Sequence, residues 1–128
     1  MKGTIMIKGH CLCGQIQFET TARPEASSMC HCSQCRRQSG GIWSSAHVTQ
    51  DALHITGDVS WYNASPEAKR GFCATCGSFL FWKRSDEDTI SFSLGAIDNP
   101  TGLKLEKHIF VAEKGDYYDI ADGVTQQS

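Results

Sequence analysis

The sequence predicts a mainly β protein built from antiparallel strands. Apolar and polar residues alternate in brief runs, and Gly, Pro, Asn and Asp separate these runs at short intervals. No long stretch repeats with the period of a helix. Hydrophobic residues make up 40% of the 128 residues and charged residues 20%, so we expect a single globular domain over residues 1–128.

The clearest predicted strand covers residues 15–19, where Ile16 and Phe18 would face a core and the polar residues between them would face water. One short helix is expected around residues 33–39, because Gly40 and Gly41 can end it. The same alternation, with turn residues between the runs, predicts further strands over residues 52–56, 59–62, 79–83, 89–94 and 103–110.

Seven cysteines fall into three tight clusters, which we interpret as two zinc sites. A cysteine pair with one or two intervening residues can present both sulfurs to one ion, and zinc prefers four ligands in a tetrahedron. Two pairs would then make one closed, structural site, whereas the remaining triplet would supply three ligands and leave one position open. The predicted structural ligands are Cys11, Cys13, Cys73 and Cys76, and the predicted catalytic zinc ligands are Cys30, Cys32 and Cys35.

The fourth ligand of the triplet zinc would be water, a substrate sulfur or a nearby histidine. His31 lies between two ligands and should point away from the ion, in a supporting or solvated position. The other histidines lie on predicted strands, where a structural role is commoner, and His108 is the one of greatest interest; they are His10, His47, His54 and His108. Spacing also permits another partition, in which the triplet takes one thiol from a pair to form the closed site.

The net charge argues against a nucleic-acid partner. The net charge of −2 would become more negative with seven ionised thiolates and two Zn²⁺ bound, which argues against nucleic acid. Lys69 and Arg70 are expected in a solvated loop, and of the adjacent Arg36 and Arg37 at most one should turn inward. The aromatic residues are expected mainly in the core.

We expect a cytoplasmic protein that does not contact a membrane. Residues 1–7 lack the continuous apolar stretch of a signal peptide, and no segment approaches membrane-spanning length. In a reducing cytoplasm the thiols stay available as metal ligands instead of pairing as disulfides, and an odd number cannot pair completely.

Three ordered motifs then carry a resemblance that spans nearly the whole chain. They are Gly-His-Cys-Leu-Cys-Gly at 9–14, Cys-His-Cys-Ser-Gln-Cys-Arg-Arg at 30–37 and Phe-Cys-Ala-Thr-Cys-Gly at 72–77. Together with the stretches at 108–111 and 118–123, they make the chain similar to the glutathione-dependent formaldehyde-activating enzyme family, also called the CENP-V/GFA family.

The resemblance implies a mostly β, Mss4-like (β-tent) fold with two zinc ions per chain, divided as the cysteine spacing suggests. It also implies a carbon–sulfur lyase that joins glutathione and formaldehyde as S-hydroxymethylglutathione or parts them. The expected partners are therefore a small thiol and an aldehyde. Two alternatives from other classes are a non-catalytic, zinc-stabilised binding module and a redox-sensitive zinc protein whose triplet releases zinc on oxidation.

Overall fold

A computed structural model describes residues 6–128, so most of the segment that bears on a signal peptide, residues 1–7, lies outside the described part. The structure is mainly β, with one short α-helix, as predicted. Its elements are β1 (Ile7–His10), β2 (Gln17–Thr20), β3 (Glu25–Cys30), α1 (Ser33–Ser39), β4 (Trp43–Thr49), β5 (His54–Thr56), β6 (Ser60–Asn63), β7 (Ala68–Phe72), β8 (Phe79–Arg84), β9 (Thr89–Ser93), β10 (Lys107–Ile109) and β11 (Thr125–Gln126), with three short 3₁₀ turns at Gln50–Ala52, Leu94–Ala96 and Val111–Glu113. Among residues 6–128, no helix has the length and apolar character needed to cross a membrane.

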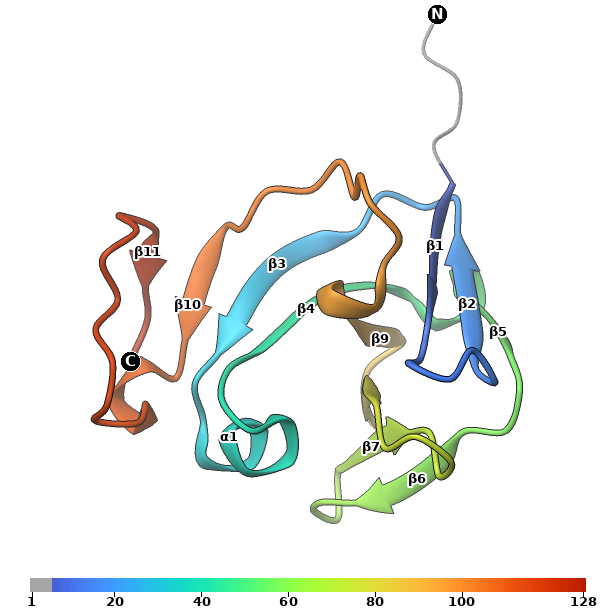
Figure 1. The fold of residues 1–128 in the computed structure, drawn as a ribbon, viewed down its shortest axis with the longest axis horizontal. Helices are drawn as coiled ribbons and strands as arrows, with labels where there is room; N and C mark the ends of the chain where they lie inside the picture. The colour runs from blue at the N-terminus through green and yellow to red at the C-terminus, as the bar shows by residue number, and fades with distance from the viewer. Residues whose placement is uncertain (1–5) are drawn as a thin grey trace, which may run out of the picture.

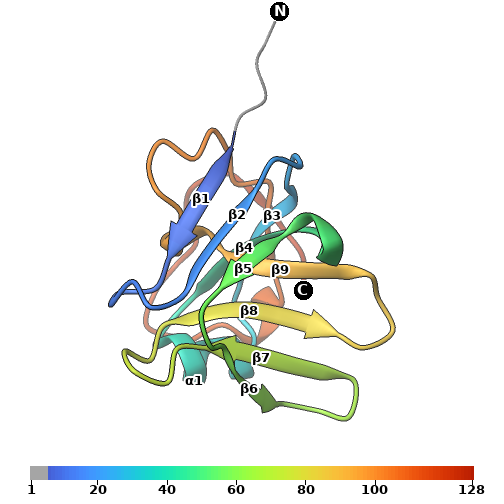
Figure 2. The same ribbon diagram turned by 90° about the vertical axis from the view of Figure 1, so that its right-hand side faces the viewer.

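The strands form two sheets. The smaller sheet has the order β1-β2-β5, and the larger has the order β11-β10-β3-β4-β9-β8-β7-β6. Figure 1 shows α1 beside the end of β3, and Figure 2 shows β1, β2 and β5 lying across the middle strands of the larger sheet. Two segments from distant parts of the chain, 73–76 and 11–13, thereby reach the same end of the molecule.

The main core lies between the two sheets. Ile16 and Phe18 are fully buried, as their alternation predicted, and Phe18 packs against Phe81 and Phe92 with ring centroids 5.4 and 5.5 Å apart. Aromatic pairs at such distances add to the stabilisation that burial provides. The small sheet is therefore held to the large one by apolar side chains as well as by the cysteines described below.

Most predicted strands are confirmed, with three kinds of correction. The stretch 103–110 forms a strand only at Lys107–Ile109, and the prediction missed β1, β3, β4, β7 and β11. In β3 the buried positions include Ser27 and Ser28, so the strand lacks the apolar alternation on which the prediction relied. The pairing is mixed, because β10 runs parallel to both β3 and β11, whereas the other named strand pairs are antiparallel.

The predicted helix is confirmed as α1 with its ends as expected. Cys32 caps the start, since its Sγ accepts the backbone N–H of Cys35 at 3.3 Å. Gly40 ends the helix with a φ of 87°, a left-handed conformation that glycine adopts without steric cost. The helix therefore begins on one cysteine of the triplet and carries another in its first turn.

Candidate metal centres and adjoining cleft

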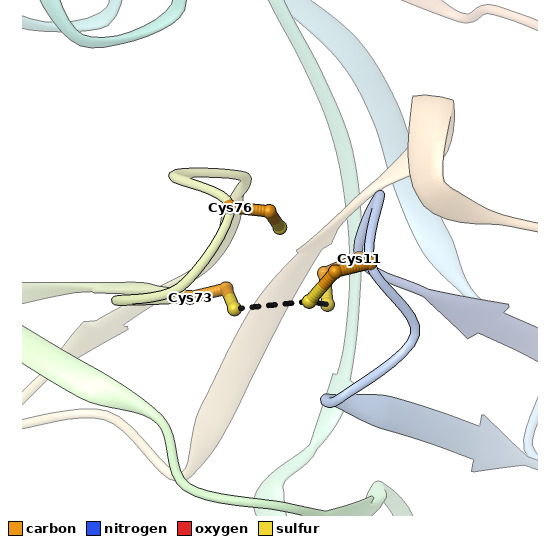
Figure 3. A group of neighbouring side chains, drawn as sticks. Cys11, Cys73 and Cys76 are labelled. Carbon is orange, nitrogen blue, oxygen red and sulfur yellow. Dashed lines mark hydrogen bonds between the residues drawn. The ribbon is translucent and has the colours of Figure 1, made fainter.

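Four cysteine sulfurs from two distant turns meet in one cluster, which we call the four-sulfur cluster: Cys11, Cys13, Cys73 and Cys76, with all Sγ atoms within 4.8 Å of one another. The first pair follows β1 and the second connects β7 to β8. Figure 3 shows the side chains of Cys11, Cys73 and Cys76 converging from these two turns. The partition predicted from spacing is the one that the structure brings together.

The sulfur spacing fits a tetrahedral metal. Cys13 Sγ lies 3.6 Å from Cys11 Sγ and 3.7 Å from Cys73 Sγ. Four sulfurs at about 2.3 Å from a central zinc would be about 3.8 Å apart. All seven cysteines are free thiols, so the cluster is available to a metal.

The two turns have the same local design. Gly14 and Gly77 each follow a cysteine pair with a φ of 82°, and their N–H groups donate to the carbonyls of Cys11 and Cys73 at 3.0 and 2.7 Å. Both turns therefore end in a left-handed conformation that glycine adopts without steric cost. Ser78 connects them, because its Oγ accepts the N–H of Leu12 at 3.0 Å.

Ser78 also tunes a thiol of this cluster. Its Oγ lies 3.3 Å from Cys76 Sγ, and hydrogen bonds from the Ser78 hydroxyl, the Ser78 N–H and the Cys13 N–H lower the pKa of Cys76 to about 5. A thiol with this pKa is ionised at neutral pH, which is the state that binds metal.

The second group, which we call the triplet, is Cys30, Cys32 and Cys35, whose sulfurs also lie within 4.8 Å of one another. Cys30 ends β3, Cys32 is the N-cap of α1, and Cys35 lies in the first turn of α1. In residues 6–128, no histidine or carboxylate joins this group. Cys30 and Cys35 are buried, whereas Cys32 is half-buried and is the sulfur most open to solvent.

Arg70 is a buried cation beside the triplet, and its expected place in a solvated loop is wrong. It lies in β7 and is 5% exposed, with Nη1 3.6 Å from Cys35 Sγ. The thiol of Cys30 donates toward Cys35, and Arg70 adds a positive charge; these effects outweigh burial and lower the pKa of Cys35 to about 6. Sequence position could not show which face of β7 Arg70 would occupy.

Two buried side-chain N–H groups in residues 6–128 lack a partner, and both lie near the triplet: Trp43 Nε1 and Arg70 Nε. Trp43 stacks on Phe79 with ring centroids 4.1 Å apart, and the Arg70 guanidinium lies 5.3 Å from the same ring. Unpaired buried donors are uncommon in proteins, and strain, a catalytic role or an ion or water that they bind accounts for those that occur. The triplet region therefore differs from the four-sulfur cluster in holding unused donors.

His31 is fully buried, and its ring faces Tyr118 and His108. Its Nε2 lies 2.9 Å from His108 Nδ1, and His108 Nε2 lies 2.8 Å from a carboxylate oxygen of Asp122. The ring is thus in the supporting position that was one of its two expected places, and the solvated alternative is wrong. His108, singled out in the sequence, is its direct partner.

The partners at the two ends fix the direction of this hydrogen-bonded chain when both rings are neutral. Asp122 only accepts, so His108 Nε2 donates to it and His108 Nδ1 accepts from His31 Nε2. His31 Nδ1 then accepts from the Tyr118 hydroxyl. Burial lowers the pKa of His31 and raises that of Tyr118, which suits a neutral ring and a protonated phenol. Tyr118 and Asp122 were not singled out as site residues, although both lie in the C-terminal stretch of the resemblance.

A cleft of about 750 Å³ opens between α1 and the strands β6 and β7. Its lining includes Arg37 and Arg70, together with Gln34, Gln38, Trp61 and Tyr62. Trp61 and Tyr62 are 37% and 62% exposed, so the expectation that they lie in the core is wrong. The neighbouring arginines diverge, because Arg36 donates from Nε to the carbonyl of Glu113 at 3.2 Å whereas Arg37 faces the cleft.

Comparison with known proteins agrees with this architecture. A crystal structure of a Rhodobacter sphaeroides protein matches with a TM-score of 0.60 and 21% identity, covering 94% of this chain and 99% of that one. A Halomonas elongata protein named "Putative glutathione-dependent formaldehyde-activating enzyme" is 29% identical over 129 residues, covering 91% of this chain and 82% of the relative. An uncharacterized lyase of Schizosaccharomyces pombe is 27% identical over 117 residues, covering 90% and 85%.

A family model also matches most of the chain. Residues 6–113 match the model described as glutathione-dependent formaldehyde-activating enzyme, a range that contains both cysteine groups and α1. The cysteine motifs quoted from the sequence, the mainly β fold and the two sulfur groups all fall within it. The chain therefore belongs to the glutathione-dependent formaldehyde-activating enzyme family.

Proposed function

We propose that this protein is a zinc-dependent carbon–sulfur lyase that joins a small thiol to an aldehyde and reverses the reaction, with glutathione and formaldehyde as the pair. The observation that carries the proposal is the contrast between the two sulfur groups. One has four sulfurs and can close around a metal, whereas the other has three and lies beside a buried arginine. Family membership and the names of the relatives agree with this chemistry.

Under this proposal the four-sulfur cluster holds a structural zinc and the triplet holds the catalytic one. Cysteine sulfurs at this spacing suit zinc, and three protein ligands are typical of sites where chemistry occurs. A zinc ion held by Cys30, Cys32 and Cys35 would lower the pKa of a substrate thiol bound to it and would polarise an aldehyde carbonyl.

The reaction itself conserves every atom. A carbon–sulfur bond forms as the π bond of the aldehyde breaks, and the proton of the thiol ends on the new hydroxyl oxygen. The protein contributes placement: Cys30 is fixed by β3, and Cys32 and Cys35 by the capped start of α1. Arg70 keeps positive charge beside Cys35, which favours the ionised thiols of the triplet.

The test is exchange NMR on glutathione and formaldehyde at equilibrium, with no protein, with the zinc-loaded protein and with Cys32→Ser. We expect exchange above the spontaneous rate only with the intact protein, because Cys32→Ser removes one triplet ligand. Circular dichroism of Cys32→Ser checks that the β fold persists. Exchange at the background rate with the zinc-loaded protein would reject this reaction and favour the binding module.

The redox-sensitive alternative makes a different prediction. If the triplet were a switch, mild peroxide would release zinc from it with the four-sulfur cluster still loaded. We expect both zinc ions to be retained, as measured by native mass spectrometry before and after treatment.

A further inference from the structure

We propose that the cleft between α1 and β6–β7 binds the carboxylate-bearing, peptide-like part of the thiol substrate, with Arg37 as the residue that pairs with a carboxylate. This inference rests on the proposed function and assigns that function a substrate site. None of the cysteines lines the cleft, so the site is separate from the sulfurs themselves.

The cleft is cationic in a protein with a net negative charge. Its lining contains two arginines and no aspartate or glutamate, whereas the whole chain carries a net charge of −2. Of the ion pairs within residues 6–128, none involves Arg37 or Arg70. Arginine without a carboxylate partner of its own is suited to bind the carboxylate of a ligand.

Amide donors surround these charges. Gln34 and Gln38 accept from the two Nη atoms of Arg70 through their Oε1 atoms, at 3.1 and 3.3 Å. Each side-chain NH₂ is then a donor for a ligand carbonyl. Gln34, Arg37 and Gln38 are spaced at i, i+3 and i+4 on α1, so they project from one side of the helix.

An aromatic side chain faces the helix across the cleft. Tyr62 is paired with Arg70 between β6 and β7, so its exposed ring lies on the same face of these strands as Arg70, and a peptide backbone or methylene chain can pack on it. The volume of about 750 Å³ suits a tripeptide-sized ligand better than formaldehyde or another one-carbon molecule. The lining thus favours an anionic, amide-containing thiol over a small neutral one.

Arg70 connects the cleft to the triplet. It lines the cleft, is almost completely buried, contacts Cys35 Sγ and leaves its Nε without a partner. A ligand anchored in the cleft therefore lies next to the side chain that touches the triplet. This continuity distinguishes the cleft from the hollow between β1, β2 and β5, which includes Glu19 and Asp98 in its lining.

Binding is tested with S-methylglutathione, which has the carboxylates and amides of the substrate but no free thiol. We expect saturable binding by isothermal titration to the zinc-loaded protein, and a Kd about tenfold weaker for Arg37→Gln, because one charge-assisted pair is lost. The matched control is Arg36→Gln, whose Kd should equal that of the wild type because Arg36 is directed to Glu113. The dimethyl ester of S-methylglutathione should bind the wild type at least about tenfold more weakly than the acid.

Failure of this inference is distinguishable from failure of the proposed function. If S-methylglutathione does not bind, or binds wild type and Arg37→Gln equally, the cleft assignment is overturned whatever the exchange assay shows. If it binds as expected but glutathione–formaldehyde exchange stays at background, the cleft assignment stands and the proposed reaction fails. Arg37 is exposed at the protein surface, so Arg37→Gln should fold normally.

Discussion

Gly14 and Gly77 set the shape of the two turns that carry the four-sulfur cluster. Both have a φ of 82°, and a β-carbon added at either position would meet no atom within 4 Å. The requirement for glycine is therefore conformational and does not come from crowding. Each turn needs this conformation to direct its N–H group at the carbonyl of the first cysteine in the pair.

Gly77→Ala is expected to lower the free energy of unfolding of the zinc-loaded protein by about 1 kcal/mol, the usual cost of placing alanine in a left-handed conformation. The measurement is the denaturant midpoint with zinc bound. Gly41→Ala is the matched control, since Gly41 has open space and no left-handed φ. Equal losses in the two variants would show that the turn conformation has no special role.

At the scale of elements, β10 and the residues that follow it hold the triplet from one side. His108 in β10 is paired with Met29 in β3, and the ring of His31 reaches both His108 and Tyr118. His31 lies between two triplet cysteines, so its partners restrain the loop on which those sulfurs depend. Segments 29–31 and 108–122 thus act as one unit, although they are distant in the chain.

Tyr118→Phe should weaken this unit. It removes the donor to the buried His31 Nδ1, and an unpaired buried acceptor costs about 1–3 kcal/mol of unfolding free energy. We also expect the triplet to lose its metal to a competing chelator sooner than the wild type does. Thermal unfolding and chelator competition measure the two effects.

Tyr117→Phe provides the comparison, because Tyr117 is 69% exposed and lies next to Tyr118 in the sequence. It should match the wild type in both measurements. If Tyr118→Phe also matched the wild type, the hydrogen-bonded chain would have no restraining effect on the triplet.

Local sequence signals account for the elements that could be predicted. Alternation identified β2, β8 and β9, and the cysteine spacing grouped the sulfurs as the structure does. The parallel pairing of β10 with β3 depends on contacts between residues far apart in the chain, which leave no periodic signal. In β3, Ser27 is buried with its hydroxyl donated to the carbonyl of Lys104, so a polar residue occupies a core position.

The candidate site, like the fold, was predictable from local sequence signals and not where it depends on contacts between distant residues. The grouping of the cysteine sulfurs follows from their spacing, because thiols that could share one ion must lie close together. The position of Arg70 could not be predicted from spacing. The side of β7 on which its side chain lies is defined only by the neighbouring strands and α1 in the folded chain. The cleft likewise arises from elements that become neighbours only in the folded chain.

For the whole molecule, the four-sulfur cluster joins the two sheets. Cys11 and Cys13 follow β1 of the small sheet, and Cys73 and Cys76 connect two strands of the large one (Figure 3). A metal held at this point would restrain the relative position of the sheets at one end, while Phe18, Phe81 and Phe92 pack them in the middle. The triplet, in contrast, lies on the large sheet and α1 alone.

Cys73→Ser is therefore expected to destabilise the protein by several kcal/mol more than Cys32→Ser, because structural zinc contributes directly to folding free energy. Native mass spectrometry should give two zinc ions for the wild type and one for Cys32→Ser. Thermal unfolding of the two variants compares their stabilities. Equal destabilisation would mean that the triplet is as structural as the four-sulfur cluster, which would count against a catalytic role.

The order of synthesis completes the two sulfur groups at different stages of the folding of the chain. A ribosome completes the four-sulfur set when residue 76 emerges, but β3 still has an unpaired edge until residues 107–109 follow. Before then the three thiols of the triplet are present, but His31 lacks its hydrogen bonds to His108 and Tyr118. A nascent chain in this interval presents an open strand edge of β3 next to the thiols of the triplet, and such an edge can pair with another chain until β10 covers it.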